Sequence, residues 1–143
     1  MTSKFTKIVN FDESLSKPEF SVTAVNRAYL QTQGDYGLLV FKLDPYHKQK
    51  PHYHTYGDID IFSVSSGSGD LHLAKVEKDK VVPGTEEKLS LKKGDTYCIA
   101  PYTLHSIETG DDPITLLNVA PNSHSAPATK EKYQRGVDIF FPK

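Results

Sequence analysis

Short apolar runs separated by turn residues dominate the pattern of this chain. The clearest runs combine β-branched, aromatic and leucine side chains, which is typical of β-strands. No window long enough for a three-turn helix keeps apolar residues at positions i, i+3, i+4 and i+7. The pattern therefore predicts a protein built mostly of strands. The predicted strands are Gly37 to Leu43, Asp60 to Ser65, Asp70 to Val76, Thr96 to Ala100 and Ile114 to Ala120.

Turn residues fall between these strands. Turns are predicted at Asp44-Pro45, Gly67-Ser68-Gly69, Lys92 to Asp95 and Gly110 to Pro113. The charged segment from Glu77 to Leu91 predicts a hairpin excursion that ends in a strand at Lys88 to Leu91. Several short strands at this spacing are typical of an all-β sandwich or barrel. The first 30 residues are too apolar for a free tail and too irregular for an assignment.

Length and charge exclude several classes of protein. The 143 residues match the usual size of one domain. The 17 basic residues nearly balance the 18 acidic ones, so the chain lacks the basic field that nucleic-acid binding needs. The polar start, Met1 to Asn10, predicts neither a signal peptide nor a membrane span. A lone cysteine, Cys98, excludes an intramolecular disulfide and a cysteine-based zinc site. We therefore expect a cytoplasmic protein without nucleic-acid or membrane partners.

Histidines supply the candidate chemistry. His52 and His54 are separated by one residue, and in extended backbone such side chains point to the same side. His105 lies far along the chain, after an apolar strand and a proline turn, where a barrel can bring it beside the pair. Imidazole suits first-row transition metals, and a nearby carboxylate adds an anionic ligand. The sequence therefore predicts a metal site.

Residues 46 to 109 resemble the two motifs of the cupins, G(X)5HXH(X)3-4E(X)6G and G(X)5PXG(X)2H(X)3N. His52-Tyr53-His54 supplies the HXH, and Asp60 to Gly67 reproduces the carboxylate, six residues and glycine. Gly94 and His105 keep the spacing of the second motif. The chain departs from the motifs at Tyr46, where the first motif has glycine, at Asp60, where it has glutamate, and at Ala100, Tyr102 and Thr109, where the second motif has proline, glycine and asparagine.

The resemblance implies an all-β fold, a cupin-type double-stranded β-helix (jelly-roll) barrel formed by residues 1 to 143 as a single domain. The first motif covers about residues 46 to 67 and the second about 94 to 109. The resemblance also implies one divalent transition metal, Fe, Mn, Ni, Co or Zn, held by His52, His54, Asp60 and His105. Small cupins commonly form homodimers, and the apolar segments Phe5 to Phe11 and Val137 to Phe141 are candidate interface strands.

The carboxylate ligand has two candidates. Asp58 has the gap to His54 that the motif prescribes, whereas Asp60 lies two residues further along. Asp60 is preferred because its spacing to Gly67 and the following apolar run match the motif. A one-residue insertion after His54, helped by Gly57, reconciles the two counts. A carboxylate that contacts a ligand rather than the ion is the alternative.

Three functions fit such a site, each with a small-molecule substrate or ligand. The first is a dioxygenase-like reaction, suggested by the resemblance and by aromatic residues near the motifs. The second is a sugar or hydroxy-acid isomerase or lyase, in which a side chain moves a proton. The third is a non-catalytic sugar-binding or sensor protein, since fold does not fix function. The candidates for proton transfer are Tyr53, Tyr56, Asp58 and His72.

Overall fold

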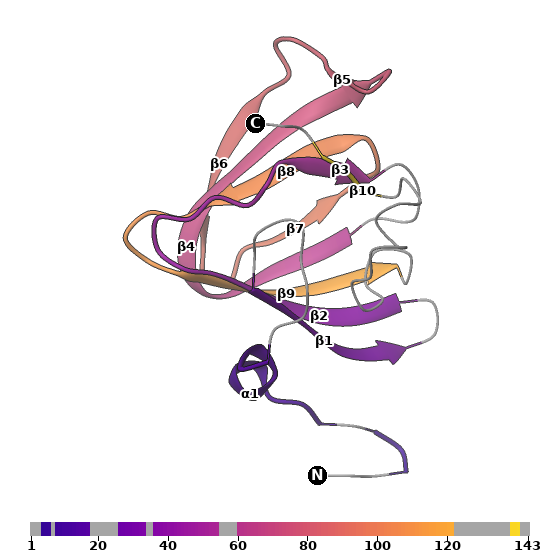
Figure 1. The fold of residues 1–143 in the computed structure, drawn as a ribbon, viewed down its shortest axis with the longest axis vertical. Coiled ribbons are helices and arrows are strands. Elements are labelled where there is room, and N and C mark those ends of the chain that lie inside the picture. The colour runs from indigo at the N-terminus through magenta and orange to yellow at the C-terminus, as the bar shows by residue number, and fades with distance from the viewer. Residues whose placement is uncertain are drawn as a thin grey trace.

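The computed structural model describes residues 4–6, 8–17, 26–33, 36–54, 60–121 and 138–140. Within these ranges the chain forms one short helix and ten strands (Figure 1). The elements are α1 (Phe11–Leu15), β1 (Asn26–Gln33), β2 (Tyr36–Leu43), β3 (His52–His54), β4 (Asp60–Glu77), β5 (Lys80–Val81), β6 (Glu87–Lys92), β7 (Thr96–Ile99), β8 (Thr103–Glu108), β9 (Ile114–Pro121) and β10 (Asp138–Phe140). The predicted all-β class is confirmed.

The strands form one curled antiparallel sheet with two facing halves (Figure 1). In the first half, β1 pairs with β2, β2 with β9, and β9 with the first part of β4, which also pairs with β7. In the second half, the last part of β4 pairs with β6 and β8. Strand β8 also pairs with β3, and β3 pairs with β10. Strand β4 therefore belongs to both halves and joins them.

The predicted turn at Gly67 to Gly69 is wrong, because β4 continues through it as a bent strand. Pairing with β9 shifts register between Val64 and Ser66, and Gly67 adopts a φ of 80°. A Cβ atom at Gly67 would lie 1.8 Å from the carbonyl oxygen of Pro113, so glycine is required there. The bend turns the strand from one half of the sheet to the other. Turn residues thus mark a change of direction here without ending the strand.

The other predicted strands are confirmed to within about two residues as β2, β6, β7 and β9. The predicted hairpin is also confirmed, since β5 pairs with the end of β4 around Lys78 and Asp79. Strand β10 lies within the apolar segment Val137 to Phe141, where a strand was predicted, whereas α1, β1, β3 and β8 have no counterpart among the predicted elements. Strand β8 was missed because its sequence, TLHSIE, mixes polar and apolar residues. Among the described residues, no helix is long and apolar enough to span a membrane.

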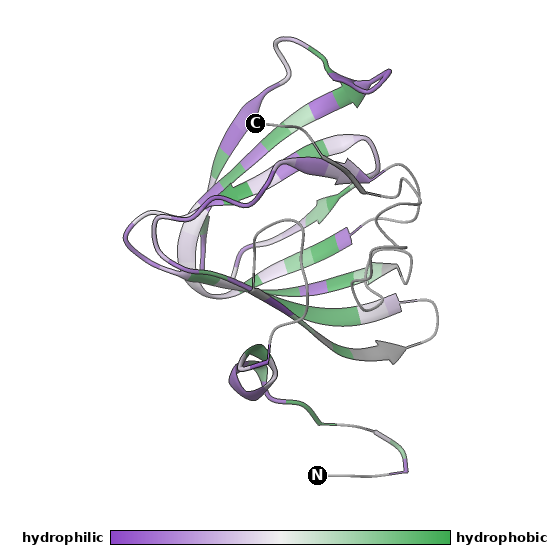
Figure 2. Cartoon of the chain, viewed as in Figure 1, coloured by the Kyte–Doolittle hydropathy of each residue, from purple (hydrophilic) through white to green (hydrophobic). Residues whose placement is uncertain are grey.

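Buried apolar residues form two clusters, and the larger one draws on strands of both halves of the sheet. Figure 2 shows hydrophobic stretches along these strands. A second cluster packs Ala28, Leu30 and Val40 against Phe11 and Leu15 of α1, so the N-terminal segment covers β1 and β2. Burial of these side chains removes apolar area from water, which stabilises the fold. The main cluster contains Leu43, Phe62, Val64, Leu71, Leu91, Ile99, Ile107, Ile114 and Leu116.

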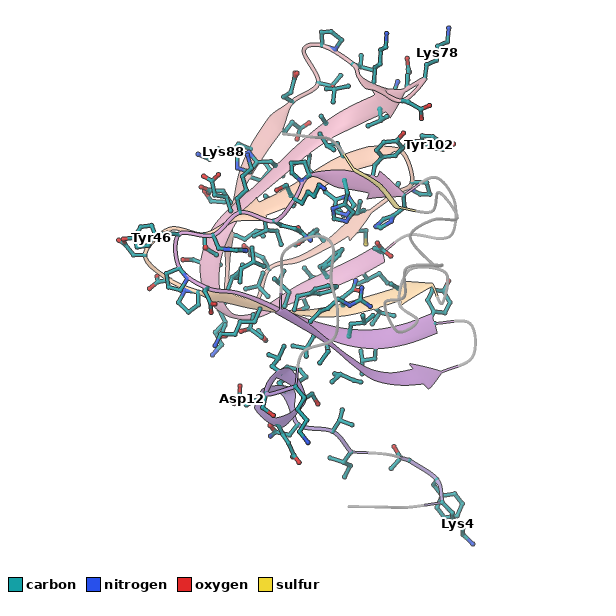
Figure 3. All side chains as sticks on the ribbon, viewed as in Figure 1. Lys4, Asp12, Tyr46, Lys78, Lys88 and Tyr102 are labelled. Atoms are coloured by element: carbon teal, nitrogen blue, oxygen red, sulfur yellow. The ribbon has the colours of Figure 1, made fainter. Side chains whose placement is uncertain are left out.

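Two tyrosines stand at turns in the left-handed region of backbone conformation (Figure 3). Tyr46 has a φ of 56° and Tyr102 a φ of 60°, and both occupy positions where the cupin motifs have glycine. The backbone N–H of Tyr46 donates to the carbonyl of Gly110 at 2.9 Å. That of Tyr102 donates to the carbonyl of His54 at 2.8 Å. These hydrogen bonds hold a conformation that costs a residue with a Cβ atom about 1–2 kcal/mol.

We expect Tyr46→Gly to be more stable than Tyr46→Ala by about 1 kcal/mol, and Tyr102→Gly to exceed Tyr102→Ala similarly. Both members of each pair lose the ring, so the difference reports the backbone alone. Ile61, an exposed residue in β4, serves as the control. There, alanine should be more stable than glycine. Urea unfolding of the six variants measures the order, and equal stabilities at positions 46 and 102 would contradict the interpretation.

Candidate metal site

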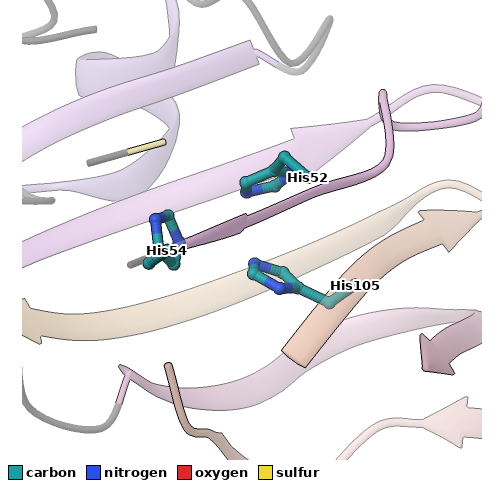
Figure 4. A group of neighbouring side chains, drawn as sticks. All are labelled: His52, His54 and His105. Atoms are coloured by element: carbon teal, nitrogen blue, oxygen red, sulfur yellow. The ribbon is translucent and has the colours of Figure 1, made fainter. Parts of the chain in front are cut away.

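Three histidines meet between β3 and β8 (Figure 4). His52 and His54 project from the same side of β3, and His52 pairs directly with His105 of β8. Their ring centroids lie between 4.2 and 5.2 Å apart. One candidate ligand nitrogen from each ring lies within 4.8 Å of the other two. The structure therefore brings together the three histidines that the sequence singles out.

Backbone carbonyls orient two of these rings. Nδ1 of His52 lies 3.0 Å from the carbonyl oxygen of Lys50, and Nδ1 of His105 lies 2.9 Å from that of Thr103. A carbonyl only accepts, so each Nδ1 carries the proton and Nε2 keeps its lone pair. This arrangement is typical of histidines that bind metals. In both cases the carbonyl lies two residues before the histidine, and no side-chain pattern in the sequence reports it.

Burial favours the neutral form of His52. His52, His54 and His105 are all buried. Burial lowers the pKa of His52 well below its ordinary value of 6.5, and the neighbouring His105 and His54 lower this pKa further. Imidazole binds a metal ion in its neutral form. His52 is therefore in the ligand form at neutral pH.

Among the residues that the structure describes, Asp60 supplies the carboxylate beside this cluster. It begins β4, is buried, and has Oδ2 3.3 Å from Nε2 of His54. Burial raises the pKa of Tyr97, which stays protonated, and the charge of Asp60 raises this pKa further. Asp58, the rival carboxylate, lies outside the described residues. The choice between the two stays a prediction.

The residues present fit a transition-metal ion. Bonds of about 2.1 Å place neighbouring ligand atoms about 3.0–3.4 Å apart around one ion. The distance of 3.3 Å between Asp60 and His54 falls in that range. The three imidazole nitrogens all lie within 4.8 Å of one another, so shifts of up to about 1.5 Å bring them into it. The group of His52, His54 and His105 can therefore hold a metal.

Two of the residues proposed for proton transfer lie away from the histidines. Tyr53 points to the opposite side of β3, where its hydroxyl donates to Oδ1 of Asp79 at 2.5 Å. Burial raises the pKa of Tyr53 to about 12, and the bond to Asp79 adds to the shift. His72 alternates with Leu71 and Leu73, which pack in the core, so it occupies the opposite face of β4. Tyr56 lies outside the described residues.

The sequence did not predict the role of Thr109, which supports the site. Thr109 stands at the asparagine position of the second motif and is buried. Its hydroxyl oxygen accepts the backbone N–H of His47 at 2.9 Å, and the hydroxyl donates to the carbonyl of Asp44 at 2.5 Å. Thr109 thus holds the turn that leads into β3. The motif position pointed to this residue, but its role depends on a contact between distant segments.

No protein-family model and no curated protein matches this sequence. Solved structures do. A conserved protein with a double-stranded β-helix domain from Klebsiella pneumoniae matches with a TM-score of 0.63 and 23% identity, over 87% of this chain and 99% of that one. A cupin-2 domain containing protein from Shewanella frigidimarina matches with a TM-score of 0.53 and 17% identity, over 80% of this chain and 94% of the other.

The chain has the cupin fold. The polyketide cyclase RemF from Streptomyces resistomycificus is also similar, with a TM-score of 0.64 and 19% identity over 90% of this chain and 91% of the cyclase. At these identities the likeness concerns the fold. The fold sets β3 beside β8. His52, His54 and His105, the positions that resemble the two cupin motifs, converge for this reason.

We expect the metal-free protein to lose stability as the pH falls from 7 to 5. The unfolded chain protonates His52 near pH 6.5, whereas the folded chain resists that proton to lower pH. Over this interval the unfolded state binds more protons, so each such histidine lowers the free energy of unfolding by up to about 1.4 kcal/mol per pH unit. Urea unfolding of chelator-treated protein measures the slope. His52→Asn should flatten it, and an unchanged slope in that variant would count against a buried neutral His52.

Proposed function

We propose that this cupin is a metal-dependent enzyme that acts on a small oxygen-bearing molecule. The carrying observation is the buried cluster of His52, His54 and His105, with candidate ligand nitrogens within 4.8 Å of one another. Asp60 is the proposed fourth ligand. Three nitrogens and one oxygen suit a divalent first-row ion such as Fe, Mn, Ni, Co or Zn.

Catalysis is favoured over a purely structural role by the number of ligands. Four protein groups around a six-coordinate ion leave two positions for other molecules. The bound ion supplies Lewis acidity, which polarises an oxygen of the substrate. The buried imidazoles exclude water from their side of the ion and fix its position, and Asp60 offsets part of its charge.

The first candidate reaction is dioxygenase-like, with both atoms of dioxygen entering the substrate. A row of aromatic side chains beside Asp60 supports this reaction. Tyr97 stacks on Phe62 with ring centroids 5.1 Å apart, and Phe41 follows at 6.1 Å from Phe62. Apolar surroundings next to the ion suit a substrate with an aromatic or aliphatic part.

The second candidate is a non-oxidative lyase or isomerase reaction, which a different observation favours. The Asp60 carboxylate is buried and lies 3.3 Å from His54. If Asp58 is the ligand, Asp60 is placed to accept a proton from a substrate carbon next to a carbonyl. The likeness in fold to a polyketide cyclase agrees with carbonyl chemistry of this kind.

We expect the purified protein to contain about one divalent ion per chain, because four convergent ligands retain an ion through purification. His52→Ala and His105→Ala should each lose it, since removal of one ligand weakens the site sharply. His47→Ala, outside the cluster, is the matched control and should keep the ion. Elemental analysis measures the content. Full metal content in both cluster variants would refute the site.

The carboxylate ligand is decided by Asp60→Asn and Asp58→Asn, which preserve size and remove charge. We expect Asp60→Asn to weaken metal binding by about 10- to 100-fold, and Asp58→Asn to have the smaller effect. Competition with a chromophoric chelator measures both affinities. The reverse order would assign the ligand to Asp58 and leave Asp60 as the proton acceptor.

Loading with Fe(II) under nitrogen, followed by measurement of oxygen uptake, tests the reaction class. We expect uptake with a catechol, thiol or diketone, and its loss in His105→Ala. Turnover of ketose phosphates, aldose phosphates or hydroxy acids under nitrogen, without oxygen uptake, would instead support the second candidate. A shift of the melting temperature with ligand but no turnover would overturn the enzymatic proposal and indicate a binding protein.

A further inference from the structure

A cavity lies on the face of the sheet opposite to the histidine cluster. Its volume is about 330 Å³, which suits a small organic molecule. His72 and Ala74 of β4 pair with Ser106 and Leu104 of β8, so these four side chains share one face and form part of the wall. Leu104 and Ser106 flank His105, whose ring points to the other side. The cavity is therefore distinct from the metal site.

The wall of this cavity is mostly apolar. Pro51, Ala74, Val81 and Leu104 supply apolar surface, of which Ala74 is buried and the others are half-buried. Val81 comes from β5, which folds back on the end of β4 (Figure 1). Apolar walls with a few polar groups are typical of small-molecule sites. This composition favours a guest with an apolar body.

His72 contributes an unsatisfied polar atom to the same wall. Among the side chains that the structure describes, Nε2 of His72 is the buried polar atom without a hydrogen-bond partner. Buried polar groups normally have one, because an unpaired group loses its hydration without replacement. The ring lines the cavity, so its rotation about the Cβ–Cγ bond presents a nitrogen to a guest. A guest with a hydrogen-bonding group would restore the missing partner.

Charge around the cavity favours a cation. Glu86, Glu87 and Lys48 line it. Glu87 pairs with Leu73, which also pairs with His105, so the Glu87 side chain lies on the histidine face and the Glu86 carboxylate is the one that serves the cavity. The Lys48 side chain already faces Glu108, with Nζ 4.0 Å from Oε2. Oε2 of Glu86 accepts the backbone N–H of Gly84 at 3.0 Å, which fixes this side chain beside the cavity. Lys88, which pairs with His72, faces Asp70 with Nζ 3.6 Å from Oδ2. With both lysines facing carboxylates, the charge of Glu86 attracts an ammonium group and repels an anion.

We propose that this cavity binds a small organic amine with an apolar body. The apolar part lies against Pro51, Val81 and Leu104, the amine faces Glu86, and His72 forms a hydrogen bond with the guest. This site goes beyond the proposed function and does not need the metal ion. Binding can therefore be measured in both metal-loaded and chelator-treated protein, so failure of one proposal leaves the other testable.

The test uses 2-phenylethylamine as the probe, with 2-phenylethanol and phenylacetate as neutral and anionic matches. Calorimetry measures the affinities, and NMR follows the histidine ring resonances. We expect the amine to bind about tenfold more tightly than the alcohol and to shift the His72 ring signals. Phenylacetate should bind most weakly. Tighter binding of phenylacetate, or no saturable binding below about 10 mM amine, would overturn the proposal.

Two sets of variants locate the site. His72→Phe keeps the ring but removes its nitrogens, so amine binding should weaken about tenfold while the melting temperature rises. His47→Phe, outside the cavity, is its control. Glu86→Gln should weaken binding by a similar factor, whereas Glu13→Gln, which changes the net charge equally away from the cavity, should leave the affinity unchanged. Unaltered affinity in His72→Phe and in Glu86→Gln would refute the assignment. If one of the two variants folds poorly, unaltered affinity in the other alone refutes it.

Discussion

The register between β3 and β8 is the constraint on which the candidate metal site depends. Side chains alternate along a strand, so a slip of one residue would turn His52 and His54 outward and Tyr53 inward. Direct pairing of β3 with β8 is short, and bonds on either side fix it. Tyr102 donates its N–H to the carbonyl of His54, and Gln49 donates its N–H to that of Ile107. The bond from Tyr53 to Asp79 ties the outer side of β3 to the hairpin beyond β4.

The bend of β4 supplies the second half of this geometry. Its first part carries Asp60 and pairs with β7 and β9, whereas its last part pairs with β8, the strand of His105. A carboxylate from one half of the sheet and a histidine from the other can share a site only because the strand turns at Gly67. The contact with Pro113 leaves no room for a side chain at this point. The bend of β4 and the geometry of the candidate site thus both depend on Gly67.

The sequence predicted what depends on local pattern and missed what depends on distant contacts. Apolar runs indicated β2 and β9, and the spacing of His52, His54 and His105 indicated their convergence. Glycines at 67 and 69 resembled a turn, because only pairing with β8 and β9 shows that β4 continues. Tyr53 was predicted as a candidate for proton transfer. Side chains alternate along β3, and this alternation points Tyr53 away from the histidines. The carbonyls of Lys50 and Thr103 orient His52 and His105, and carbonyls leave no signature in a sequence.

Burial gives the histidine cluster its chemical bias. Three imidazoles at centroid distances near 5 Å cannot all carry a proton, because each positive charge would oppose the others away from water. The cluster therefore favours neutral rings, whose lone pairs need a positive partner. A proton on one ring satisfies that ring alone, whereas a divalent ion engages all three at once and also balances Asp60. The same burial that makes protonation of His52 unfavourable thus keeps its lone pair available for a metal ion near neutral pH.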